Sequence, residues 1–118
     1  MALALLLYYL LIYRPDHLKD QVLVSVAYNA GNCTKQYPLL VIIQNESSKT
    51  VMKVEWNIGV YQHGYSTDLA GHSNYTSDKI LKPGEKWQRC YTLPGDIASR
   101  VDQAGLEYRI SYKYVTFE

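Results

Sequence analysis

The stretch from Val51 to Tyr61, Val-Met-Lys-Val-Glu-Trp-Asn-Ile-Gly-Val-Tyr, decides the fold of this chain. From Lys53 onward, apolar and polar side chains alternate with a period of two, which is typical of a strand with one face buried in a core. We therefore expect a long β-strand here, with Trp56 anchoring the core. The buried face would carry Val54, Trp56, Ile58 and Val60, and the opposite face Lys53, Glu55, Asn57 and Tyr61.

The flanking sequence predicts further short strands separated by turn residues. Residues 21–29 alternate in the same way, and residues 38–44 are apolar on both faces, as expected of a central strand. Lys82-Pro83-Gly84-Glu85 predicts a hairpin or a corner, because Pro and Gly suit the two central positions of a tight turn. Additional strands are expected over 77–81, over 87–93 and from 106 to the C-terminus. The last would carry Leu106, Tyr108, Ile110, Tyr112 and Tyr114 on one face, and one helical turn is expected within 94–105.

This pattern of short strands without a long amphipathic helix predicts an all-β, antiparallel β-sandwich over residues 21–118. The order Cys33, Trp56, Cys90 is similar to the immunoglobulin arrangement, in which a core Trp packs against a disulfide. Gln88 stands where an immunoglobulin tyrosine corner would place Tyr, and Cys33 follows turn-like residues. We expect an immunoglobulin-like sandwich in which any disulfide ties a loop to a strand.

The first thirteen residues form an uncharged apolar run that stops at Arg14. A bilayer core needs roughly 20 helical residues to be crossed, so this run is short for an independent span and would gain from cover by neighbouring helices. A cleaved signal peptide is the alternative, although the run lacks a basic n-region and a small-x-small cleavage site. We expect residues 1–20 to form one transmembrane anchor helix and its juxtamembrane segment, with the anchor made by Leu5, Leu6, Leu7, Tyr8, Tyr9, Leu10, Leu11, Ile12 and Tyr13.

Length limits the chain to one domain, and charge argues against a nucleic-acid binder. The chain has 118 residues, which leaves room for a single domain after the anchor. Twelve Lys and Arg against eleven Asp and Glu give a net charge of +1, so the chain lacks the basic footprint of a nucleic-acid binder. We expect no nucleic-acid partner.

Cys33 and Cys90 lie far apart in the sequence, which suits one disulfide that closes a long loop. The same spacing suits a metal site less well. Two unrelated free thiols are the alternative. A disulfide would place the domain in an oxidising compartment. Arg14 and Lys19, by contrast, favour the cytoplasmic side under the positive-inside rule.

Several motifs resemble those of a known group of proteins. Residues 41–47, 51–61, 64–69 and 78–85, followed by Cys90, resemble small bacterial membrane-anchored proteins often labelled "multidrug transporter". The same layout is similar to the FxLYD-like immunoglobulin-like domains of bacterial envelope proteins, although no Phe-x-Leu-Tyr-Asp stretch occurs. The resemblance implies a single N-terminal anchor in the bacterial inner membrane, a periplasmic C-terminal sandwich and no known catalysis. One short apolar segment cannot itself form a transporter.

Tyrosine is over-represented, with twelve Tyr against one Phe and two Trp. The polar stretch 62–75 has the Tyr, Ser, Gly and Asn composition of binding loops, in which tyrosine offers a large rigid contact surface. A solvated loop with ordinary tyrosines is the alternative. The residues expected to contact a partner are Tyr61, His63, Tyr65, His72 and Tyr75.

Motifs for catalysis and for cofactors are missing from the sequence. His63, Asp68, His72 and Asp78 supply donor types for a metal, but their spacing is irregular. The chain contains no G-x-S-x-G, H-E-x-x-H or glycine-rich phosphate loop. We expect no enzyme activity, no cofactor and no metal site.

Three functions fit these observations. The preferred hypothesis is a non-catalytic accessory subunit that packs on the periplasmic side of a larger respiratory, photosynthetic or transport complex in the inner membrane and stabilises it. The short anchor favours this hypothesis, because it would be stable mainly beside other helices. The alternatives are a freestanding envelope module that binds a ligand or a protein, and a periplasmic metal-handling protein.

Overall fold

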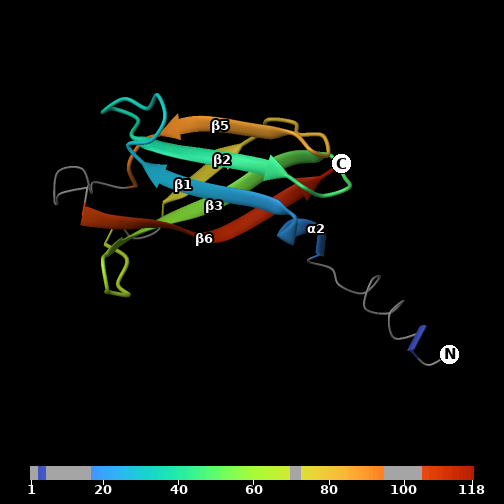
Figure 1. Ribbon diagram of the computed structural model, residues 1–118, viewed down its shortest axis with the longest axis horizontal. Helices are drawn as coiled ribbons and strands as arrows, with labels where there is room; N and C mark the ends of the chain where they lie inside the picture. Colours follow the sequence, from blue (N-terminus) through green and yellow to red (C-terminus); the bar gives the residue numbers. More distant parts are fainter. Residues whose placement is uncertain (1–2, 5–16, 70–72, 95–104) are drawn as a thin grey trace.

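The structure, a computed structural model, describes residues 3–4, 17–69, 73–94 and 105–118, and their regular secondary structure is almost wholly β-strand (Figure 1). The predicted all-β class is therefore confirmed. The described residues form α2 (His17–Asp20), β1 (Val22–Tyr28), β2 (Leu39–Asn45), β3 (Val51–Gln62), β4 (Asn74–Ser77), β5 (Lys86–Tyr91) and β6 (Leu106–Phe117).

The strands form two antiparallel sheets of three strands, in the orders β1-β2-β5 and β4-β3-β6. β2 is central in the first sheet, as its two apolar faces predicted, and β3 is central in the second. Both sheets contribute to one buried core, to which β2 gives Leu39, Val41 and Ile43. The predicted buried face of β3 is also confirmed, because Val54, Trp56, Ile58 and Val60 are at most 1% exposed.

Two β-bulges in the β3–β6 ladder decide which side chains face the core. Val51 pairs with Phe117 and Lys53 with Thr116, so Met52 is the extra residue of the first bulge. It allows Val51 and Val54, three positions apart, both to point inward. In the second bulge, Ser111 is extra, because Asn57 and Ile58 pair with Tyr112 and Ile110.

The bulge at Ser111 overturns the predicted face of the last strand. Strict alternation would place Tyr108, Ile110, Tyr112 and Tyr114 together, but the extra residue reverses the inward and outward positions that follow it. Tyr108 and Ile110 pack against the core, whereas Tyr112 and Tyr114 are 53% and 52% exposed.

The predicted strand over 77–81 is wrong in position. The chain pairs with β3 earlier, over Asn74–Ser77, and afterwards makes only an isolated bridge between Leu81 and Val51. Since β4 and β5 belong to different sheets, residues 82–85 form a corner rather than a hairpin. Gly84 supplies the positive φ, 86°, that this turn requires.

Asn45, at the end of β2, holds together the connections that pass between the sheets. Its side chain is fully buried, and its Nδ2 donates to the carbonyls of Lys49 (2.8 Å) and Leu81 (2.9 Å). Its Oδ1 accepts from the backbone N–H of Ser47 (3.0 Å) and from the Ser47 hydroxyl (2.6 Å). The β2–β3 turn and the β4–β5 corner are thus fixed to the same side chain.

The predicted disulfide between Cys33 and Cys90 is confirmed. Cys33 lies in the loop between β1 and β2, and Cys90 lies on β5, so the disulfide joins a loop to a strand. Cys90 pairs with Leu40, which alternates with the buried residues of β2. The disulfide therefore lies on the outer face of its sheet, outside the core.

The described chain has two distinct ends. β1 begins at Val22, which pairs with Asn45, and the last residue of β6 pairs with Val51, so these segments share one end of the molecule, called here the Val22 end. β3 then runs to Gln62 at the opposite, far end, where the β3–β4 connection lies (Figure 1).

The predicted membrane anchor, Leu5 to Tyr13, lies outside the described residues. Within the part of the chain that the structure describes, no helix is both long and apolar enough to cross a bilayer.

Replacement of Asn45 tests whether its side chain holds the β2–β3 turn and the β4–β5 corner in place. Asn45→Ala leaves the buried backbone N–H of Ser47 without its acceptor, at about 1 to 3 kcal/mol. It also removes the side-chain bonds to the carbonyls of Lys49 and Leu81, at about 0.5 to 1.5 kcal/mol each, although the Leu81 carbonyl keeps the Val51 N–H (2.8 Å). We expect urea denaturation to show a loss of at least about 2 kcal/mol in the free energy of unfolding. Asn74→Ala, an exposed asparagine on β4, is the matched control and should change it by less than about 0.5 kcal/mol. Equal losses in the free energy of unfolding for Asn45→Ala and Asn74→Ala would contradict the role given to Asn45.

Candidate functional site

The end of β3 and the start of β6 bring charged and aromatic side chains together at the far end. His63 follows β3, and its Nδ1 lies 2.6 Å from Glu107 Oε1 on β6. Arg109 binds the other carboxylate oxygen of Glu107 through Nε (3.2 Å) and Nη2. The Arg109 guanidinium also lies over the ring of Tyr61, 4.5 Å from its centroid. The exposed Tyr65 follows in the same turn, where its backbone N–H donates to the carbonyl of Gln62 at the end of β3 (2.9 Å). Tyr61, His63, Tyr65, Glu107 and Arg109 are called here the far-end cluster.

A glycine on β3 makes room for this arrangement. A Cβ at Gly59 would lie 2.8 Å from the Cε2 and Oη atoms of Tyr61, so the tyrosine ring leans back over the glycine. Arg109 pairs with Gly59 across the ladder, which places its guanidinium above that ring. Gly59 therefore fixes the orientation of Tyr61 by letting the ring approach the backbone.

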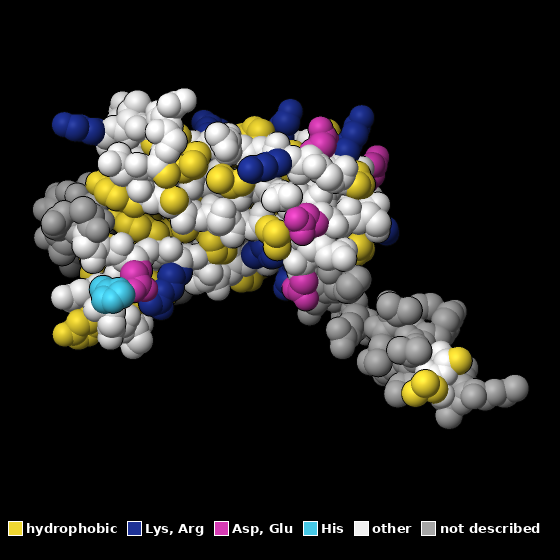
Figure 2. All heavy atoms as spheres, in the orientation of Figure 1, with side chains coloured by type: hydrophobic (Ala, Val, Ile, Leu, Met, Phe, Trp, Pro, Cys, Tyr) yellow, Lys and Arg dark blue, Asp and Glu magenta, His cyan; other side chains and the backbone are white. Residues whose placement is uncertain are grey.

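The cluster is open to solvent and its carboxylate stays charged. The side chain of His63 is 87% exposed, and Tyr65 is 63% exposed. Hydrogen bonds from Arg109 and then from His63 hold the pKa of Glu107 below its ordinary value. In Figure 2 a histidine, an acidic and a basic side chain lie side by side at this end, next to exposed hydrophobic side chains. Such a surface can bind a partner through an aromatic and charged contact.

The structure separates the five residues that the sequence selected for partner contact. Tyr61, His63 and Tyr65 belong to the far-end cluster, whereas His72 lies outside the described residues. Tyr75 lies on β4 and packs against Trp56 (ring centroids 6.1 Å apart) and Tyr91 (5.6 Å). Its hydroxyl donates to the carbonyl of Thr92 (2.9 Å), so this tyrosine links the edges of the two sheets.

The donor types noted for a metal do not gather around one point in the described part of the chain. Asp68 accepts the backbone N–H of Val60 (3.0 Å), which ties the loop back to β3. Among the described residues, no group of three His, Cys, Asp or Glu side chains could hold a metal ion.

Sequence reasoning missed two partners of His63 and Tyr61. In the sequence, Glu107 and Arg109 stand between the apolar positions of the last strand, and their approach to His63 and Tyr61 depends on the β3–β6 register. It also missed a hollow of about 340 Å³ on the outer face of the β4-β3-β6 sheet, beside Tyr112. No local signal in the sequence marks the bulge that turns Tyr112 outward.

Comparison with known proteins leaves the family open, since no protein-family model, no curated protein and no solved structure matches the chain.

The packing of Tyr75 predicts an unusual titration. Burial raises the pKa of Tyr75 from 10.0 to about 12, so the folded protein holds this phenol proton more tightly than the unfolded chain does. The free energy of unfolding should therefore fall as pH rises between 10.0 and about 12. We expect the difference between tyrosinate absorbance titrations of the wild type and Tyr75→Phe to have a midpoint near 12. A midpoint near 10.0 would show that Tyr75 is solvated.

Proposed function

We propose that this protein is a non-catalytic, membrane-tethered module that binds a partner protein through the far-end cluster. The observation that carries the proposal is the separation of the two ends. The chain enters the domain at Val22, and the exposed aromatic and charged residues lie at the other end of β3. Twelve strand residues span roughly 40 Å at about 3.3 Å each, so an N-terminal tether would hold this cluster well away from the membrane surface.

The chemistry of the far-end cluster suits a protein partner. Tyr and Arg are the residues most often responsible for binding energy at protein interfaces. The hydrogen bonds that Arg109 and His63 make to Glu107, together with the Tyr61 contact, order these side chains before binding. Less conformational entropy is then lost when a partner docks.

The same geometry argues against catalysis at the cluster. A general acid needs a carboxyl whose pKa is raised towards neutrality, usually by burial. The pKa of Glu107 is instead lowered by Arg109 and His63. The cluster is also open to water, whereas catalytic groups gain strength in sites from which water is excluded.

The strand order supports the predicted immunoglobulin-like class. The orders β1-β2-β5 and β4-β3-β6 agree with strands A-B-E and C′-C-F of that fold. We infer that the domain is an immunoglobulin-like sandwich. The disulfide is a departure, because it joins a loop to β5 on the outside of one sheet instead of crossing the core between two strands.

We place the domain in the periplasm of a bacterium, anchored by its N-terminus in the inner membrane. The Cys33–Cys90 disulfide supports this location, since disulfides persist in oxidising compartments. Membership of a larger membrane complex as an accessory subunit is the second candidate function. The short apolar run at the N-terminus favours it, because neighbouring helices would cover that run. Contact through the far-end cluster would then require a part of the complex that rises above the membrane.

The location predicts the redox state of the cysteines in cells. Cells are treated with a membrane-permeant maleimide at harvest, and the mass of the protein is measured before and after reduction. We expect Cys33 and Cys90 to be protected until reduction, because the disulfide forms outside the cytoplasm. Labelling of both thiols without reduction would place the domain in the cytoplasm.

The partner itself can be captured from native membranes. A tag on Glu118 lies at the Val22 end, away from the cluster, because the neighbouring Phe117 pairs with Val51. After gentle detergent extraction, we expect a defined protein to co-purify at fixed stoichiometry, with the species identified by native gel and mass spectrometry. Tyr65→Ala should lower its recovery about tenfold, as expected for an interface tyrosine.

Tyr114→Ala is the matched control, because Tyr114 is similarly exposed but lies on the sheet face. It should leave recovery within about twofold of the wild type. Equal losses in both variants, or migration of the wild type alone, would overturn binding at the far end. Co-migration with a large membrane complex would select the accessory subunit over the freestanding module.

A further inference from the structure

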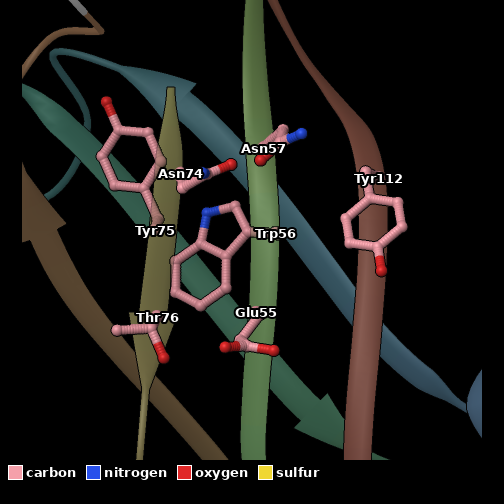
Figure 3. Close-up of a pocket in the computed structure, with 7 residues that line it drawn as sticks. All are labelled: Glu55, Trp56, Asn57, Asn74, Tyr75, Thr76 and Tyr112. Carbon is pink, nitrogen blue, oxygen red and sulfur yellow. The ribbon is translucent and has the colours of Figure 1, made fainter. Parts of the chain in front are cut away.

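A second candidate site lies on the outer face of the β4-β3-β6 sheet, and none of its lining residues belongs to the far-end cluster. Its Asn57 is two positions along β3 from Gly59, over which the Tyr61 ring leans. It is a hollow of about 340 Å³, within the size range of small-ligand sites. Figure 3 shows that β3 crosses its middle, with residues of β4 on one side and Tyr112 of β6 on the other. The outward-facing residues at the hollow are Glu55, Asn57, Asn74, Thr76 and Tyr112.

A β-bulge creates this hollow by turning Tyr112 outward. Without the extra residue Ser111, Tyr112 would continue the inward series of Tyr108 and Ile110. With it, Tyr112 pairs with Asn57 and is 53% exposed. Bulges are frequent beside binding sites, where they redirect a side chain.

The polar groups of the hollow come in rows across the sheet. Asn74 and Tyr112 pair with Asn57 from its two sides, and Thr76 pairs with Glu55. Amide and hydroxyl groups both donate and accept hydrogen bonds. An aromatic ring beside such groups offers an apolar surface with a polar tip. The ligand that complements this set has many hydroxyls and an apolar ring face.

Charge and backbone pairing argue against two other kinds of ligand, an ion and a peptide that adds to β3 as a strand. The only acid among the hollow's lining residues, Glu55, is paired with Lys53 at 3.3 Å, so the hollow favours a neutral ligand over an ion. β3 is hydrogen-bonded to β4 and to β6, so a peptide cannot add to it as a further strand. We propose that this hollow binds a saccharide, with Tyr112 stacked on a sugar ring and the two asparagines bound to its hydroxyls.

Titration with sugars tests the proposal. The full chain, extracted in detergent, is titrated with neutral hexasaccharides of glucose, mannose, galactose and N-acetylglucosamine, and separately mixed with peptide-free cell-wall glycan strands. We expect at least one of these probes to bind and to shift the side-chain amide NMR signals of Asn57 and Asn74. Binding of a soluble hexasaccharide would indicate a free sugar ligand, and binding of the strands alone would indicate a wall polymer.

Tyr112→Ala should weaken this binding at least about tenfold, through loss of the stacking surface. Because Tyr112 is exposed, the variant should fold, which its unfolding curve checks. Tyr65→Ala is the matched control and should bind sugar like the wild type. Tyr112→Ala should in turn recover the protein partner as the wild type does. The saccharide site and the partner site can therefore be disproved independently. No binding by the wild type to any probe, or unchanged binding by Tyr112→Ala, would overturn the saccharide site.

Discussion

The buried side chain of Asn45 is the constraint on which the two-sheet arrangement depends. Both polar atoms of the side chain have partners. Its Oδ1 accepts from Ser47 on the β2–β3 turn, and its Nδ2 donates to the carbonyls of Lys49 on the same turn and of Leu81 on the β4–β5 corner. The backbone of Asn45 adds bonds to Gly84 (2.7 Å) and Glu85 (2.9 Å). Since both connections carry the chain between the sheets, one asparagine fixes how the sheets are joined. A polar network of this kind is stabilising because every member is satisfied.

The second constraint is the register of β3 against β6. Its two bulges hold Val51 and Val54 in the core together and send Tyr112 and Tyr114 to the outside. The same ladder brings Glu107 within 2.6 Å of His63. One long strand pair therefore shapes the core on one face and both candidate binding surfaces on the other.

Much of the fold could be predicted from local pattern. Residues 53–61 alternate because one face of β3 is buried there, and residues 38–44 are apolar on both faces because β2 is central. The position of β4 could not be predicted in this way, since pairing with β3 decides it. The bulge at Ser111 was missed for a similar reason, because it depends on the partner strand. Of the site, Tyr61, His63 and Tyr65 were selected by composition, while Glu107 and Arg109 depend on a register that no local pattern encodes.

The two ends of the molecule differ in the chemistry that they expose. At the Val22 end, polar groups are buried and satisfied around Asn45, and Lys113 reaches across from β6 to donate to the carbonyl of Val22. Burial lowers the pKa of Lys113, so that contact is made at some cost in solvation. At the far end, by contrast, the charged and aromatic groups remain in water. On the proposed function, the satisfied polar groups hold the end at which the chain enters the domain, and the exposed groups of the far end are left for the partner.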